Sequence, residues 1–408
     1  MVMRYVYRVV AMLVLNTLLV YACFEGAASG VFTMARVITQ PTARLVGEGS
    51  PREKVSYYAF QEWTRQYWHE FRLSRTQRYY PYVGWRRAPF KGQTIEIDQQ
   101  GVRVTPGADC SATSFKVFTF GPSEMWGTGA PNWGTIPAYV QQGLAQRRQG
   151  PVCVMNFAES AYVLMQDVLM LLVQLRSGNV PDVVLFYNIG GDIYAAYQSG
   201  RAGVPENLAQ LAARFEGRQK PSTVVDQLRR TSAYALIDAL MDTLTIAHPP
   251  QQAPTPRTLL TYESMGIDVA QLKDLIVQDY VRIYGLVHAL AHEYGFTPFF
   301  FLPPTIALGH KPLTPEEQGM KQAAESDVAL STLATAVYHT LEREASHYQN
   351  LYSLVHIFDC YDALLWIDTG HVTPIGNQVI AKSMLDIMQR RSSDEKSSTI
   401  FSGCQVPS

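Results

Sequence analysis

Three residues at two distant places in the chain are of the types that carry out acyl transfer. Ser123 stands in the segment Gly121-Pro122-Ser123-Glu124, directly after a short apolar run. Asp368 and His371 stand in the segment Asp368-Thr369-Gly370-His371, near the end of the chain. A histidine can take the proton from a serine hydroxyl, and an aspartate three residues earlier on the same loop can hold its imidazole in one tautomer. The pattern predicts a serine-hydrolase-like site made of Ser123, His371 and Asp368.

A serine nucleophile also needs donors for the negative oxygen that develops on the attacked carbonyl group. Two further turns follow apolar runs, at 156–158 and at 190–192, and their backbone N–H groups could face that oxygen. Side chains at the same turns, and one just after the nucleophile, are placed to contact a substrate. The predicted oxyanion donors are Ser123, Ala158 and Gly191, and the predicted substrate contacts are Trp126, Asn188 and Asp192.

The elements that must position these residues are short apolar segments alternating with helical ones. Strands are expected at 115–120, 152–156, 183–187 and 299–302, and the run 364–367 is strand-like. Helices are expected at 137–147, near 161–176, at 269–294 and within 315–350, and Thr373-Pro374 begins the last one as N-cap and N1. This alternation indicates a three-layer α/β/α domain with a short parallel sheet, whose ligands bind beyond the carboxyl ends of the strands.

These segments resemble the SGNH (GDSL-like) hydrolase superfamily, especially exported members of extracellular polysaccharide systems. The segment 118–137 resembles the family's nucleophile block, and 368–377, reading DTGHVTPIGN, resembles its acid–base block very closely. The segment 181–194 resembles the third block in position and flanks. The resemblance covers roughly residues 80 to 390 and implies an SGNH or flavodoxin-like fold, with Ser123 as nucleophile, His371 as general base and Asp368 as its partner.

The chain departs from the family pattern at two oxyanion donors. Ala158 stands where the second block usually has glycine, and Gly191 stands where the third block usually has an asparagine that donates from its side chain. Loss of one such donor costs about 10²–10³ in rate, unless a water or Asn188 replaces it. Three readings stay open: an esterase or O-acyltransferase acting on acyl esters of a carbohydrate, a degenerate domain that is a structural or binding subunit of a membrane complex, and a coincidence in an unrelated α/β fold.

Other residues that could do chemistry have a plainer interpretation as packing or surface residues. Trp126 and Trp133 could stack on a sugar ring, but filling the core is an equal alternative. His288 and His292 lack the zinc pattern His-Glu-x-x-His, and His310 lies in a loop. There is no Walker loop or dinucleotide fingerprint, so neither a cofactor nor a metal is expected. The net charge of −1 gives no basic face for a nucleic acid.

An apolar run near the N-terminus predicts the location of the protein. Arg4 and Arg8 precede the apolar segment 9–24, which is broken only by Asn16 and continues more weakly to residue 32. About 20 apolar residues span a bilayer, and the placement of the cations leaves everything after residue 30 outside the cytoplasm. We expect a single-pass protein of the cell membrane with a periplasmic or extracellular main domain. A signal peptide cleaved after Ala22 is the alternative, and Asn16 could contact an integral-membrane partner.

The chain divides into four regions: a transmembrane anchor at 1–32, a linker with an aromatic-rich helix at 33–80, the α/β domain at 81–392 and a polar tail at 393–408. The α/β domain carries a helical insertion at about 198–256. In the aromatic-rich helix, Phe60, Trp63, Tyr67 and Phe71 recur at helical spacing and form an expected packing face. Disulfides are expected between Cys110 and Cys153 and between Cys360 and Cys404, with free buried thiols as an equal alternative.

Overall fold

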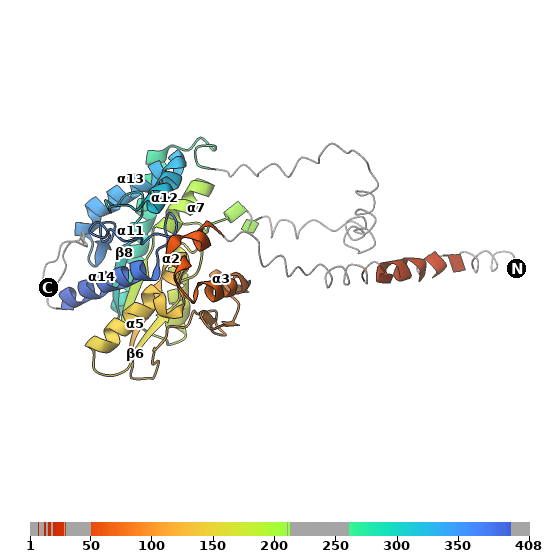
Figure 1. Cartoon of the computed structure of the whole chain (residues 1–408), viewed down its shortest axis with the longest axis horizontal. Helices are drawn as coiled ribbons and strands as arrows, with labels where there is room; N and C mark the ends of the chain where they lie inside the picture. Colours follow the sequence, from red (N-terminus) through yellow and green to blue (C-terminus); the bar gives the residue numbers. More distant parts are fainter. Residues whose placement is uncertain are drawn as a thin grey trace. The chain divides into compact units, whose positions relative to one another are not determined.

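A five-stranded parallel sheet forms the centre of the computed structural model (Figure 1). The structure describes residues 50–209, 211–212 and 261–392, together with 7, 12–13, 15–17, 19–27 and 29. The strands are β5 (Phe115–Phe120), β6 (Val152–Asn156), β7 (Val183–Tyr187), β8 (Thr297–Leu302) and β9 (Leu351–Ser353). They lie in the order β6-β5-β7-β8-β9, and every neighbouring pair is parallel. The predicted α/β class with a parallel sheet is therefore confirmed.

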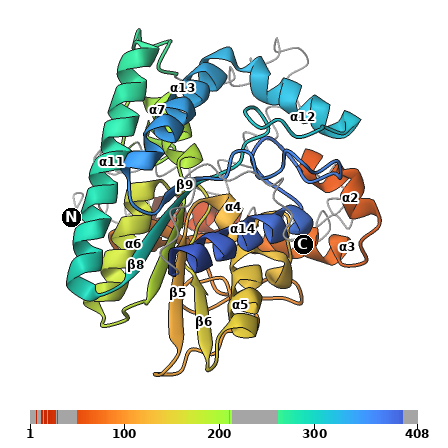
Figure 2. The same ribbon diagram turned by 90° about the vertical axis from the view of Figure 1, so that its left-hand side faces the viewer.

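Helices cover both faces of this sheet. On one face lie α5 (Ile136–Arg147) and α14 (Pro374–Ser392), and on the other lie α6 (Leu164–Arg176), α7 (Gly190–Ser199), α11 (Val269–Tyr294) and α13 (Val328–Glu344) (Figure 2). On β7, Val184 and Phe186 belong to one core and Leu185 and Tyr187 to the other. Because both faces are buried, the strands are almost continuously apolar.

Capping residues at two helices explain why the sequence predicted where these helices begin. The Asp268 side chain accepts the backbone N–H of Gln271 at the start of α11, and Gly295, with φ 80°, ends that helix. The Thr373 hydroxyl accepts the N–H of Gly376 at 3.3 Å in the first turn of α14. The bounds expected for both starts are confirmed.

The compact unit begins at residue 50, earlier than the predicted boundary at 81. Val55, Tyr58, Tyr67 and Trp68 are buried in the same core as α5 and α14, which ties this segment to the sheet. Phe60 is 86% exposed, so the predicted packing face is wrong at that position. The segment contains η2 (Pro51–Lys54), α2 (Ser56–Ala59), α3 (Thr64–Leu73) and the strand pairs β1 (Gln77–Tyr80) with β2 (Gly84–Arg87) and β3 (Phe90–Lys91) with β4 (Glu96–Ile97).

The fifth strand lies elsewhere than the sequence predicted. The apolar run 364–367 is a loop in which Trp366 forms one isolated bridge with Val372, and β9 takes the edge of the sheet instead. The backbone N–H groups of Leu365 and Trp366 donate to the carboxylate of Glu317 at 2.9 and 3.2 Å. Glu317 lies at the start of α12 (Pro315–Ser326). Its carboxylate accepts the backbone N–H groups that a strand would use for hydrogen bonds to a neighbouring strand.

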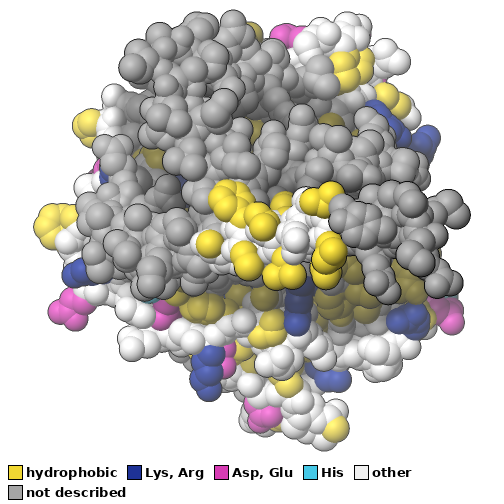
Figure 3. All heavy atoms as spheres, turned by 90° about the vertical axis from the view of Figure 1, so that its right-hand side faces the viewer, with side chains coloured by type: hydrophobic (Ala, Val, Ile, Leu, Met, Phe, Trp, Pro, Cys, Tyr) yellow, Lys and Arg dark blue, Asp and Glu magenta, His cyan; other side chains and the backbone are white. Residues whose placement is uncertain are grey.

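Much of the predicted anchor lies outside the described residues. Those described between 7 and 29 are helical, and no helix in the described part of the chain is long and apolar enough to cross a membrane. The structure therefore does not support the predicted transmembrane helix at 1–32. Residues 33–49, most of the predicted insertion and the tail at 393–408 also lie outside the described residues. Figure 3 shows side chains of Lys, Arg, Asp and Glu, of both signs, scattered over the described surface of one view.

One predicted disulfide is confirmed. Cys110 is bonded to Cys153 on β6, across a sequence separation of 43 residues. Cys360 is also disulfide-bonded, while its predicted partner Cys404 lies outside the described residues. The exposed Cys23 is a free thiol.

Candidate active site

Ser123 is delivered to the carboxyl edge of the sheet by a turn that requires glycine. Gly121 follows β5 with φ 154°, and a Cβ atom there would lie 2.5 Å from the carbonyl oxygen of Tyr187 at the end of β7. Glycine alone lets the two strand ends approach so closely. Ser123 then opens the short helix α4 (Ser123–Trp126), and its side chain is half-buried. The hydroxyl therefore remains accessible at the edge where ligands bind in such sheets.

The acid–base loop brings its two side chains to this serine. His371 Nε2 lies 2.8 Å from Ser123 Oγ, and His371 Nδ1 lies 2.9 and 3.0 Å from the two carboxylate oxygens of Asp368. Asp368 also accepts the backbone N–H groups of Gly370 and His371 at 2.9 and 2.7 Å, which fixes the turn. His371 is buried, with 8% of its surface exposed. The structure thus brings together all three residues that the sequence predicted.

A fourth residue of this cluster was missed by the sequence analysis. Arg52 donates from Nε to Asp368 Oδ2, from η2 within the segment interpreted as a linker. Burial raises the pKa of Asp368. The charge and hydrogen bond of His371, together with the charge of the Arg52 guanidinium, outweigh burial and hold the pKa of Asp368 well below its ordinary value. Asp368 is therefore ionised through the mildly acidic range. No local signal marks Arg52, because 316 residues separate it from its partner.

The serine hydroxyl has a second acceptor besides His371. Ser123 Oγ lies 3.1 Å from Glu124 Oε2, on the next residue along the chain. One hydroxyl proton can serve only one of these two acceptors at a time. Glu206, on the segment after α7, belongs to the same acidic region. Burial, with the charges of Glu124 and Asp192, raises the pKa of Glu206 to about 7. The approach to Ser123 is therefore rich in carboxyl groups.

The predicted oxyanion donors are incompletely provided. The Ala158 N–H already donates to Asn156 Oδ1 at 3.2 Å. Gly191 offers no side chain, and a Cβ atom there would overlap the carbonyl oxygen of Tyr162. The Ser123 N–H lies in the first turn of α4, where no intrahelical acceptor exists. The Gly191 N–H likewise lies in the first turn of α7, so the backbone N–H groups of Ser123 and Gly191 stay the predicted donors.

The three side chains predicted to contact substrate are buried. Trp126 is 0% exposed and lies between the guanidinium groups of Arg87 and Arg103, whose central carbons are 3.6 and 4.2 Å from the ring centroid. The core alternative for Trp126 is the one that the structure shows. Arg103 in turn donates to the carbonyl oxygens of Trp126 and Gly127 at 3.0 and 2.8 Å, which holds the end of α4. These cations therefore hold the short helix α4, on which Ser123 lies.

Asn188 and Asp192 also have structural partners. Asn188 is 1% exposed, and its Nδ2 donates to Asp167 at 2.8 Å. Asp192 is 7% exposed and accepts the N–H of Leu164 at the start of α6. Burial raises the pKa of Asp192 to about 7. Both side chains are occupied by partners within the fold in this structure, so a direct contact with substrate stays a prediction.

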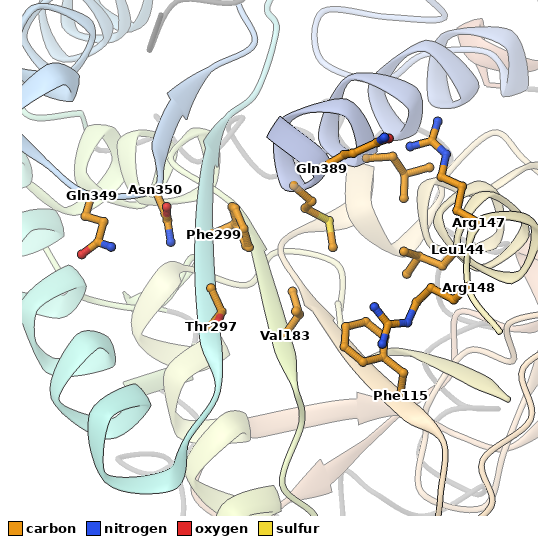
Figure 4. Close-up of a pocket in the computed structure, with 12 residues that line it drawn as sticks. Phe115, Leu144, Arg147, Arg148, Val183, Thr297, Phe299, Gln349, Asn350 and Gln389 are labelled. Carbon is orange, nitrogen blue, oxygen red and sulfur yellow. The ribbon is translucent and has the colours of Figure 1, made fainter. Parts of the chain in front are cut away.

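A separate pocket lies at the opposite end of the sheet. Figure 4 shows Phe115, Val183 and Thr297, the first residues of β5, β7 and β8, facing Arg147 and Arg148 near the end of α5. The serine, by contrast, follows the last residue of β5. This pocket therefore has no part in the Ser123 site.

Comparisons with known proteins give similarities of structure only. No family model matches the chain, and no curated protein matches it in sequence. Among solved structures, the acetyl xylan esterase AlAXEase has 13% identity and a TM-score of 0.35, over 67% of this chain and 98% of its own. A lipolytic protein of the G-D-S-L family from Veillonella parvula has 9% identity and a TM-score of 0.34, over 67% and 98%.

An alpha/beta hydrolase enzyme from the metagenome of Lake Arreo is also similar. It has 14% identity and a TM-score of 0.33, over 68% of this chain and 96% of its own. At such identities and TM-scores these similarities bear neither on the family nor on the activity of this chain. The activity is argued below from the chain's own residues.

Proposed function

We propose that this protein is a serine ester hydrolase of SGNH type. The observation that carries the proposal is the continuous hydrogen-bonded chain from Ser123 Oγ through the His371 imidazole to Asp368, with separations of 2.8 and 2.9 Å. A nucleophile, a base and a group that orients the base, each within hydrogen-bond reach, are what acyl transfer to serine requires. The exposed part of Ser123 allows a substrate to reach it.

The reaction follows from this geometry. Ser123 Oγ attacks the carbonyl carbon of an acyl ester while His371 Nε2 takes the hydroxyl proton. Asp368 holds the Nδ1 side of the ring and stabilises the imidazolium that forms. Collapse of the tetrahedral intermediate breaks the ester C–O bond, and His371 returns the proton to the departing alcohol. Water, activated by the same histidine, then releases the acid from the acyl-enzyme.

The substrate class rests on the resemblance of the acid–base block to exported members of the superfamily. We take the substrate to be an acyl ester of a carbohydrate, commonly an acetyl ester, with transfer to a second sugar as the alternative to hydrolysis. A location outside the cytoplasm is supported by the Cys110–Cys153 disulfide, since such bonds persist in oxidising compartments. Attachment to the membrane and an integral-membrane partner remain part of this proposal.

A degenerate domain is the second candidate, and specific observations favour it. The Ala158 N–H is engaged by Asn156, and Gly191 cannot supply a side-chain donor. Without a complete oxyanion hole the tetrahedral intermediate is less stabilised, by about 3 to 4 kcal/mol for one lost donor. In this reading the domain keeps its fold as a structural or binding subunit of a membrane complex.

Labelling with a fluorophosphonate probe tests the proposal and separates the two candidates. The full-length protein should be labelled, the Ser123→Ala variant should not, and release of acetate from acetylated sugars should disappear in the same variant. A folded wild-type protein that neither reacts with the probe nor releases acetate would show that the degenerate reading is correct. Ser160→Ala is a suitable control, because this serine follows another strand end and lies outside the hydrogen-bonded chain.

The location can be tested on the protein in its own cells. Cells are quenched in acid so that thiols and disulfides cannot exchange. If the Cys110–Cys153 bond is present, a thiol-alkylating reagent should change the electrophoretic mobility that these two cysteines contribute only after the protein has been reduced. Protease added to spheroplasts should then digest the domain. Protection from protease together with reduced cysteines would contradict export.

A further inference from the structure

Two histidines and an aspartate form a cluster that plays no part in the Ser123 site. His310 lies in the loop after β8, and His356 and Asp359 lie in the turn after β9. The ligand atoms of the three side chains all lie within 4.8 Å of one another. The two loops follow adjacent parallel strands, so the cluster stands at the same carboxyl edge of the sheet as Ser123.

The spacing of the donor atoms matches that around a small cation. Asp359 Oδ2 lies 3.0 Å from His356 Nδ1 and 3.5 Å from His310 Nδ1. Two ligands of a tetrahedral zinc ion are about 3.3 Å apart, because each bond to the metal is about 2.0 Å long. The two imidazole rings are nearly parallel, with an angle of 6° between their planes and 5.1 Å between centroids. Both Nδ1 atoms therefore approach the same carboxylate oxygen from neighbouring positions.

The cluster is held in place by hydrogen bonds around it. The other carboxylate oxygen of Asp359 accepts the backbone N–H of His310 at 2.8 Å, which fixes the carboxylate and the first loop together. Beyond it, Lys311 Nζ donates to the buried carboxylate of Glu317 at 2.7 Å. Glu317 also accepts backbone N–H groups from the loop after β9. The hydrogen bond to Asp359 is of the kind that orients a metal ligand, and the bonds of Glu317 hold the neighbouring loops together.

A hydrogen bond alone explains less of this arrangement. A neutral imidazole donating to Asp359 accounts for His356, whose side chain is 25% exposed, but not for the second ring stacked on it. The His310 side chain is 78% exposed and has no packing need to lie there. A cation bound by both residues would explain why the exposed His310 ring lies against the Asp359 carboxylate, which is already hydrogen-bonded to His356.

We propose that His310, His356 and Asp359 bind a divalent transition-metal ion, with zinc as the ion of best fit. Imidazole nitrogens suit zinc, whereas calcium and magnesium prefer oxygen ligands alone. Three protein ligands leave a fourth position for water on the exposed side of His310. The ion joins the loop after β8 to the segment that runs on to Asp368 and His371. It therefore braces the acid–base loop from a distance and takes no part in the proton transfers.

Zinc binding to the full-length protein tests this site. The protein is purified without a histidine tag, stripped with a chelator and titrated with zinc chloride by calorimetry. We expect one tightly bound zinc ion per chain, weaker binding by at least tenfold in His356→Ala and in Asp359→Asn, and no comparable binding of magnesium or calcium. Cobalt(II) added to the stripped protein should give the visible absorption of a tetrahedral complex.

Controls keep the test independent of folding and of the proposed hydrolase. His292→Ala and His339→Ala remove exposed histidines from α11 and α13 and should leave zinc binding unchanged. Ser123→Ala should also bind zinc like the wild type, so loss of hydrolysis and loss of metal binding are distinguishable. Asp359→Asn keeps the acceptor for the His310 N–H, and circular dichroism checks that each variant is folded. A wild-type protein that binds no zinc, or zinc binding unchanged in all ligand variants, would overturn the proposal.

Discussion

At the scale of single residues, the Ser123 site depends on charges that the sequence motifs do not include. Arg52 contacts the carboxylate that orients His371, and Glu124 competes with His371 for the serine proton. In the proposed reaction, the first charge lies near the base and the second lies beside the nucleophile. Both charges would then act on the imidazolium and on the oxyanion that acyl transfer forms.

Removal of the Arg52 charge should weaken the base's support without unfolding the protein. In Arg52→Gln, we expect a rate of ester hydrolysis about tenfold lower, because Asp368 then loses a cation that helps to keep its pKa low and a donor that fixes its carboxylate. Arg72→Gln breaks a similar ion pair with Glu53 at the surface and is the matched control. An unchanged hydrolysis rate in Arg52→Gln would assign Arg52 a packing role only.

Replacement of Glu124 should have the opposite effect. Glu124→Gln removes a negative charge near the developing oxyanion, and it leaves a weaker acceptor for the serine proton. We expect fluorophosphonate labelling to become about two- to tenfold faster, which corresponds to about 0.4 to 1.4 kcal/mol in the barrier. Rates of labelling at a fixed pH measure this directly. Slower labelling would mean that Glu124 assists Ser123 instead of competing with His371.

At the scale of elements, the turn between β7 and α7 leaves no room at position 191 for the asparagine of the SGNH pattern. The start of α7 lies against the chain that leads into α6, where the carbonyl oxygen of Tyr162 fills the space that a Cβ of Gly191 would need. Asp192 on the same turn caps Leu164 at the start of α6. The starts of α6 and α7 are therefore in contact at the place that the side chain of an oxyanion donor at position 191 would occupy.

Introducing this asparagine should consequently not improve the site. We expect Gly191→Asn to lower the free energy of unfolding by about 1–3 kcal/mol, because a side chain is forced into a packed site, and to bring no gain in esterase rate. Gly190→Ala is the control, since a Cβ atom there meets nothing within 4 Å and alanine favours a helix. Denaturant unfolding of both variants decides the matter. A stable and faster Gly191→Asn enzyme would show that the turn can move to admit the side chain.

At the scale of the whole molecule, the core beneath the site carries buried carboxyl groups that titrate near neutrality. Burial raises the pKa of Asp192 to about 7, whereas carboxyl groups of an unfolded chain titrate near about 4. Between these values the folded protein holds a proton that the unfolded chain has lost. The contribution of Asp192 to the free energy of unfolding therefore falls as pH rises from about 4 to about 7.

The Asp192→Asn variant should remove this dependence. Its Oδ1 can still accept the N–H of Leu164, and it carries no charge at any pH. We expect its melting temperature to exceed that of the wild type at pH 8, with the difference shrinking toward pH 4. Asp274→Asn, at an exposed position on α11, should leave the slope of melting temperature against pH unchanged. Parallel pH curves for wild type and Asp192→Asn would contradict the prediction.

The disulfide is a second property of the whole molecule. Cys110–Cys153 closes a loop with a sequence separation of 43 residues that includes β5 and the serine turn. Replacement of both cysteines by alanine should lower the free energy of unfolding by about 2–4 kcal/mol, chiefly through the entropy of the unfolded chain. Thermal unfolding with and without reductant measures the loss. Cys23→Ser, at the free cysteine, should melt like the wild type in both conditions.

The sequence by itself determined the strands β5, β6 and β7, the long helix α11, and the pairing of Ser123 with Asp368 and His371. These features depend on local signals: apolar runs, helix caps and turn glycines. Two short motifs, each made of residues close together in the sequence, mark Ser123 and the Asp368–His371 pair. Each signal acts over a few residues, so it can be seen without the fold. The same reasoning misplaced the fifth strand, because an apolar run alone does not reveal that Glu317 binds its backbone N–H groups.

Only the tertiary structure decided which polar side chains surround the serine and which are buried beneath it. Arg52 reaches Asp368 from 316 residues away, and Trp126, Asn188 and Asp192 are buried by contacts with elements distant in sequence. The cluster of His310, His356 and Asp359 likewise forms only because β8 and β9 are neighbours in the sheet. The physical reason is common to all: hydrogen bonds and charges act over a few ångströms in space, and strand order determines which distant residues come within that range.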